Sequence, residues 1–206
     1  NWFPASDDPK KNFLVGDSMG AEAAWRYGLL KPDSFGCIAP IGKQPCDYSY
    51  LEPYRQMSTI EFAKMAKSSK LPAAYGPEGS ALHNREINNI RKYDTVGDFL
   101  DSMENTMVRF DEAAKKGALP KVYLAGEKTN TKLKAFEQHA DQIGAKEVTF
   151  AWVDQQPDVM DFNELAFEMF MNFVGLENIE NPKNGKPPHM PGVHDFPEGT
   201  PGRTMH

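Results

Sequence analysis

Short apolar runs alternate with helix-forming segments along much of the chain. Four apolar runs have the length and composition of buried strands, at residues 12–16, 36–41, 121–125 and 147–153. Three of them are followed by segments typical of helices, at residues 19–30, 131–143 and 160–174. The alternation predicts an α/β fold in which helices flank a parallel sheet joined by right-handed crossovers.

The second apolar run contains a proline, Pro40. Because proline cannot donate a backbone hydrogen bond within a sheet, we expect Pro40 to mark the end of the strand rather than its middle.

Residues 44–118 interrupt the alternating pattern. Helices are expected at residues 59–67 and 96–116, with a loop rich in Gly, Pro and Asn between them. An insertion of this length often covers an active site, so we interpret residues 44–118 as an insertion or cap region. The predicted organisation is a domain at residues 1–178, followed by an extended tail rich in Pro and Gly at residues 179–206.

Composition and charge narrow the possible partners. The 206 residues suffice for one domain with a sizeable core, and the net charge is −6. No basic block points to nucleic acid, and no apolar run approaches the roughly 20 residues that span a membrane. Cys37 and Cys46 have neither a disulfide framework nor zinc-site spacing, so we expect both to be reduced, which leaves the compartment open.

The segment Gly16-Asp17-Ser18-Met19-Gly20 carries the chemistry. This Gly-x-Ser-x-Gly pattern follows a predicted strand and opens a predicted helix, which is the context of a nucleophile elbow. The flanking glycines are expected because so tight a turn leaves no room for side chains. Ser18 would stand above the strand ends as nucleophile, and the backbone N–H of Met19 would stabilise an oxyanion. The alternative interpretation is a serine that caps the helix on a Gly-rich turn.

The chain resembles the esterase-D-type branch of the α/β-hydrolases. The likeness rests on Phe13-Leu-Val-Gly-Asp-Ser-Met-Gly-Ala21 and on Lys31-Pro-Asp-Ser-Phe-Gly-Cys-Ile-Ala-Pro-Ile-Gly42, and it is weaker downstream to about residue 176. The branch includes S-formylglutathione hydrolases and feruloyl, acetylxylan and tributyrin esterases. The resemblance implies a serine esterase that acts on a small, acyl or aryl ester through an acyl-enzyme, and we expect no cofactor. We also expect no metal, because the one cluster of aspartates, Asp154, Asp158 and Asp161, fits the start of a helix better than a metal site.

The chain departs from the family pattern at the other two triad positions. The family acid would stand at Thr129, and Glu127 is the acidic residue nearest to it. The family histidine would stand at Asp158, whose carboxyl cannot replace an imidazole as a base near neutral pH. A tail segment, Gly192-Val-His-Asp-Phe196, has the local look of the family's histidine motif, so His194 is the candidate base. The alternatives are a solvated tail histidine and the absence of a triad.

The resemblance covers only the C-terminal half of the family fold. Strands that normally flank the elbow strand should precede residue 10, so another chain or an N-terminal segment is expected to complete the sheet, and an oligomer is expected. An open apolar edge would otherwise invite aggregation. Two functions therefore stay open: a serine esterase, or a catalytically silent hydrolase-fold module that serves binding or assembly.

Overall fold

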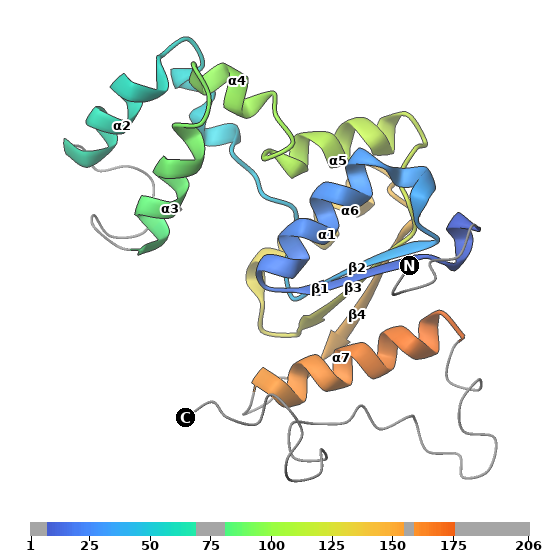
Figure 1. Cartoon of the computed structure of the whole chain (residues 1–206). Coiled ribbons are helices and arrows are strands. Elements are labelled where there is room, and N and C mark those ends of the chain that lie inside the picture. Colours follow the sequence, from blue (N-terminus) through green and yellow to red (C-terminus); the bar gives the residue numbers. More distant parts are fainter. Residues whose placement is uncertain (1–7, 69–80, 155–158, 176–206) are drawn as a thin grey trace, which may run out of the picture. The chain divides into compact units, whose positions relative to one another are not determined.

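A computed structural model describes residues 8–68, 81–154 and 159–175 (Figure 1). The chain divides into two units, residues 1–155 and 156–206, which are described separately. The first unit holds the sheet and the insertion. No helix among the described residues is long and apolar enough to cross a membrane.

The first unit is built on a parallel sheet of four strands. The strands are β1 (Phe13–Asp17), β2 (Cys37–Ile41), β3 (Val122–Glu127) and β4 (Val148–Val153). They lie in the order β1-β2-β3-β4, and every neighbouring pair is parallel. The predicted α/β class and parallel sheet are therefore confirmed, and each strand lies within two residues of its predicted bounds.

Pro40 lies one residue before the end of β2, near the place expected from the sequence, and opposite Gly16 of β1. Because β2 is a central strand, the missing N–H of Pro40 has to be accommodated within the sheet. The ladder between β2 and β3 is kept by the N–H groups of Ile38 and Gly42, which donate to the carbonyls of Lys121 and Ala125. The position of Pro40 falls between these two bonds, so the missing N–H costs a single rung of the ladder.

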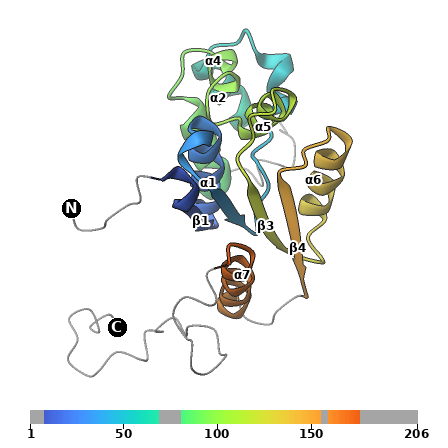
Figure 2. The same cartoon turned by 90° about the vertical axis from the view of Figure 1, so that its right-hand side faces the viewer.

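Three helices share one face of the sheet, as Figure 2 shows. They are α1 (Met19–Leu30), α5 (Thr106–Lys115) and α6 (Thr131–Gln142), which match the predicted helices closely at α1 and α6. Trp25 of α1 packs edge-on against Phe110 of α5 and Phe136 of α6, with ring centroids 5.8 and 5.7 Å apart. This aromatic cluster and the apolar side chains of β2 and β3 form one buried core. Two short 3-10 helices, η1 (Pro9–Lys11) and η2 (Pro32–Ser34), flank β1 and α1.

The insertion has a second core of its own. It contains η3 (Ser49–Tyr54), α2 (Thr59–Ser68), α3 (Ala81–Ile90) and α4 (Val96–Leu100). Its buried apolar residues form a cluster separate from the sheet core, with the largest side chains at Phe62, Phe99, Leu51, Ile90 and Leu100. The segment 44–118 is thus a packed layer, although its last helix, α5, contributes Phe110 to the sheet core.

Two predictions within the insertion were wrong. Helix α3 occupies part of the expected loop, because its few apolar residues, including Ile87 and Ile90, are buried in the insertion core. The expected helix at residues 96–116 is two helices, α4 and α5. The break is held by Asn105, which is almost fully buried: its amide donates to the carbonyl of Leu100 and its side-chain oxygen accepts from the Tyr48 N–H.

The second unit contains one described helix, α7 (Val159–Phe173). It confirms the helix predicted at residues 160–174. The predicted tail at residues 179–206 lies outside the described residues.

Replacing Phe110 tests whether α5 belongs to the sheet core. Phe110→Ala removes a fully buried ring that contacts Trp25 and Phe136, so it should lower the free energy of unfolding by about 3–5 kcal/mol. Urea denaturation followed by tryptophan fluorescence measures the change. Tyr27→Ala, at an exposed position of α1, is the matched control and should change it by less than about 1 kcal/mol. Equal losses in both variants would contradict the assignment of α5 to the core.

Candidate active site

Ser18 stands at the turn between β1 and α1 in a backbone conformation that serine rarely adopts. Its φ is 53° and its ψ is −112°, and it is the one non-glycine residue with positive φ among the described residues. Such a conformation costs about 1–3 kcal/mol and persists where the surrounding structure enforces it. A sharp, strained turn from strand to helix is the defining geometry of a nucleophile elbow.

The two glycines that flank Ser18, Gly16 and Gly20, differ in the space around them. A Cβ at Gly16 would lie 2.2 Å from the carbonyl oxygen of Gly20 and 2.9 Å from the nitrogen of Ala21, so this position requires glycine. A Cβ at Gly20 would meet nothing within 4 Å. The expectation of steric crowding is correct at Gly16 and wrong at Gly20, because the helix start closes over the strand at only one of the two positions.

The Ser18 side chain is exposed and does not cap its own helix. The alternative interpretation of Ser18 as a helix-capping serine is therefore not supported. Met19 is the first residue of α1, and its side chain is 67% exposed. The first N–H groups of a helix have no partner within the helix, so the N–H of Met19 is of the kind that can bind a developing negative charge.

Glu127 lies at the same edge of the sheet as Ser18. It is the last residue of β3, as Asp17 is the last residue of β1, and parallel strands end at a common edge. One strand, β2, separates them, so the two strand ends lie about 10 Å apart. Thr129, which occupies the family's acid position, donates a long hydrogen bond of 3.4 Å from its hydroxyl to the Glu127 carboxylate.

No described histidine ring lies near this edge. His139 pairs with Asp111 at 2.7 Å in the last turn of α6, and α6 runs from the carboxyl end of β3 back to the start of β4. His139 therefore lies at the opposite end of the strands from Ser18. His194 and Asp158 lie outside the described residues. The structure places Ser18, Met19 and Glu127 at one edge but does not describe a base beside them.

Cysteine does not offer a second nucleophile. Cys37 and Cys46 are both free, as expected from the sequence. Burial raises the pKa of the Cys37 thiol to about 11, and burial followed by the charge of Glu22 raises the pKa of Cys46. Neither thiol is activated as a thiolate near neutral pH. Among the described residues, no group of three or more His, Cys, Asp or Glu side chains could hold a metal ion.

Two solved structures of serine hydrolases resemble the structure of this chain. The chain resembles FphF, a fluorophosphonate-binding serine hydrolase of Staphylococcus aureus, with a TM-score of 0.56 and 14% identity over 84% of this chain and 57% of that one. It also aligns with the S-formylglutathione hydrolase FrmB of Staphylococcus aureus, with a TM-score of 0.49 and 16% identity over 84% of this chain and 54% of that one. The chain thus spans little more than half the length of both proteins.

These likenesses are structural. No family model and no curated protein matches the sequence. The likeness to FphF confirms the α/β-hydrolase fold that the sequence resemblance implied, over 57% of the length of that protein.

The two glycines provide a matched test of the elbow geometry. Gly16→Ala forces a methyl group against the backbone of Gly20, so it should lower the melting temperature by several degrees or prevent folding. Gly20→Ala adds the same methyl group to open space in a helix, where alanine is favoured over glycine by about 1 kcal/mol, so it should not lower the melting temperature.

Thermal unfolding followed by circular dichroism measures both variants. Comparable destabilisation by the two substitutions would mean that the turn between β1 and α1 is not built as described.

Proposed function

We propose that this chain is a serine hydrolase of carboxylic esters, with Ser18 as its nucleophile. The proposal is carried by one observation: Ser18 adopts positive φ between a parallel strand and a helix, and its side chain is left exposed. A residue bearing a reactive hydroxyl is seldom held in a strained conformation without a functional reason. The α/β-hydrolase fold, shared with the serine hydrolase FphF, supports the same class.

The chemistry would follow the usual course of acyl transfer. The Ser18 hydroxyl oxygen would attack the ester carbonyl carbon, while a base accepts the hydroxyl proton. The Met19 N–H would stabilise the negative carbonyl oxygen, and the base would return the proton to the leaving alcohol. Water would then release the acid from the acyl-enzyme by the same steps.

We propose His194 as the base. The 18 residues between residue 175 and His194 could span roughly 55 Å if extended, and we propose that they bring His194 to Ser18 in the same or a neighbouring subunit. Glu127 is proposed as the acid that orients the imidazole, since it ends a strand on the Ser18 edge of the sheet.

A catalytically silent module is the second candidate function. It is favoured by the sequence, because Asp158 and Thr129 stand where the family has its histidine and its acid. In this case Ser18 would keep the elbow geometry without a base, and the chain would serve binding or assembly.

Ester hydrolysis separates the two candidates. Ser18→Ala should reduce the hydrolysis of p-nitrophenyl acetate to the uncatalysed background, because the attacking oxygen is lost. Ser49→Ala, at another exposed serine, is the control and should hydrolyse the ester as the unmodified chain does.

The tail histidine is tested in the same assay. His194→Ala should lose activity as Ser18→Ala does, whereas His189→Ala, in the same tail, should retain it. Activity that persists in His194→Ala would reject His194 as the base. Background activity in the unmodified chain would favour the silent module.

We also propose that a further strand completes the sheet beside β1. Within the described residues β1 pairs with β2 alone, and its residues Phe13–Gly16 are only half-buried. Light scattering should therefore find a mass above the 23.1 kDa of one chain. A mass of 23.1 kDa at every concentration would contradict the proposal that a second chain supplies this strand.

A further inference from the structure

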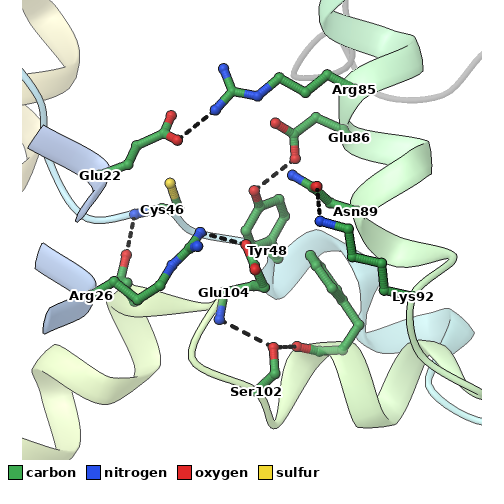
Figure 3. Close-up of polar contacts among 12 residues, drawn as sticks. Glu22, Arg26, Cys46, Tyr48, Arg85, Glu86, Asn89, Lys92, Ser102 and Glu104 are labelled. Carbon is green, nitrogen blue, oxygen red and sulfur yellow. Dashed lines mark hydrogen bonds and ion pairs between the residues drawn. The ribbon is translucent and has the colours of Figure 1, made fainter. Parts of the chain in front are cut away.

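A polar pocket lies between α1 and the insertion, beginning one residue after Ser18. Its volume is about 330 Å³. Figure 3 shows its charged side chains, which come from α1, from α3 and the turn after it, and from the segment before α5. The residues that matter here are Met19, Glu22, Arg26, Arg85, Lys92 and Glu104.

Cations outnumber carboxylates in this pocket. Arg26, Arg85 and Lys92 face two carboxylates, although the chain as a whole has a net charge of −6. The carboxylates lie deeper than the guanidinium groups. The side chains of Glu22 and Glu104 are 17% and 14% exposed, whereas those of Arg85 and Arg26 are 42% and 37% exposed. A molecule that enters the pocket therefore meets positive charge first.

Both carboxylates already have cationic partners. The Arg85 Nη2 lies 2.7 Å from Glu22, which also pairs with Lys43 from outside the pocket, and the Arg26 Nη2 lies 2.5 Å from Glu104. The pairs Arg85–Glu22 and Arg26–Glu104 join the insertion to α1. They also neutralise the carboxylates that would otherwise repel an anion.

One cation of the pocket has no carboxylate partner. Among the described residues, the Lys92 ammonium contacts a neutral group, the side-chain oxygen of Asn89 at 2.9 Å, and forms no ion pair. An anion that enters the pocket can therefore pair with the Lys92 ammonium without displacing a carboxylate.

The pocket is placed to hold a part of the substrate. Met19 and Arg26 are seven residues apart on α1, so the pocket extends about 10 Å along the helix from the elbow. Consider an ester whose carbonyl lies at Ser18 and carries a charged group at the end of a short chain. That charged group could lie in the pocket.

We propose that this pocket binds an anionic group, a carboxylate or a phosphate, carried by the substrate on a short chain from the ester carbonyl. This inference rests on the proposed esterase function and names its substrate class: negatively charged esters. Lys92 would supply the ion pair, and the partly exposed guanidinium groups of Arg85 and Arg26 would add positive charge.

Paired substrates test the substrate class. The mono-p-nitrophenyl esters of succinate, glutarate and adipate each end in a carboxylate, and p-nitrophenyl butyrate, pentanoate and hexanoate are their neutral counterparts. For at least one chain length, kcat/KM should be about fivefold or more higher for the charged ester, and the ratio should fall as salt is added.

Lys92→Gln should bring the ratio of kcat/KM for the charged ester to kcat/KM for the neutral ester towards one. Arg91→Gln changes the same charge at the adjacent exposed residue outside the pocket, and it should keep the ratio. A ratio near one at every chain length in the unmodified chain, or equal loss in both variants, would overturn the proposal.

Direct binding separates this proposal from the esterase function. Glutarate and inorganic phosphate are titrated into the unmodified chain and into Ser18→Ala, Lys92→Gln and Arg91→Gln, and binding is followed by amide NMR shifts. Saturable binding that only Lys92→Gln loses supports the pocket even if no ester is hydrolysed, and the preferred anion then tells a carboxylate substrate from a phosphorylated one. Hydrolysis of neutral esters without binding of either anion would reject the pocket and leave the esterase proposal standing.

Discussion

The turn between β1 and α1 is the constraint on which the rest of the site depends. Ser18 adopts a φ of 53° where the start of α1 packs so closely on the end of β1 that a Cβ at Gly16 would overlap the Gly20 carbonyl. The helix is fixed further along by Trp25, which is buried in the sheet core, and by Gly28, where a Cβ would overlap the Ile38 side chain. Packing along the whole of α1 thus holds one strained residue at its start.

Local patterns in the sequence are sufficient to predict the strand and the helix on either side of Ser18. The apolar run before Gly16 and the helix formers after Ser18 predict β1 and α1 nearly to the residue, because buried parallel strands and helices have distinct patterns. The failures depend on contacts between distant residues. Helix α3 depends on the burial of Ile87 and Ile90 in the insertion core, and the break before α5 depends on Asn105 reaching the backbone of Tyr48.

Some residues of the candidate site could be predicted from the sequence, and others could not. Ser18 and Met19 could be identified because their chemistry is encoded in five consecutive residues. Glu127 could be placed at the same edge because it ends a strand of the same parallel sheet. The charged pocket could not be predicted, since its residues come from α1, α3 and the segment before α5, and no local pattern links them. The insertion has a core of its own, and it also supplies Arg85, Lys92 and Glu104 to the pocket that begins beside Ser18.

Fluorophosphonate labelling, with the modified residue located by mass spectrometry, tests the central claim most directly. A fluorophosphonate reacts with a serine only when the hydroxyl is activated, so it reports on the nucleophile without knowledge of the ester. The account predicts one covalent adduct on Ser18, and none in Ser18→Ala. An unlabelled chain, or an adduct on a different serine, would contradict the assignment of Ser18 as the reactive centre.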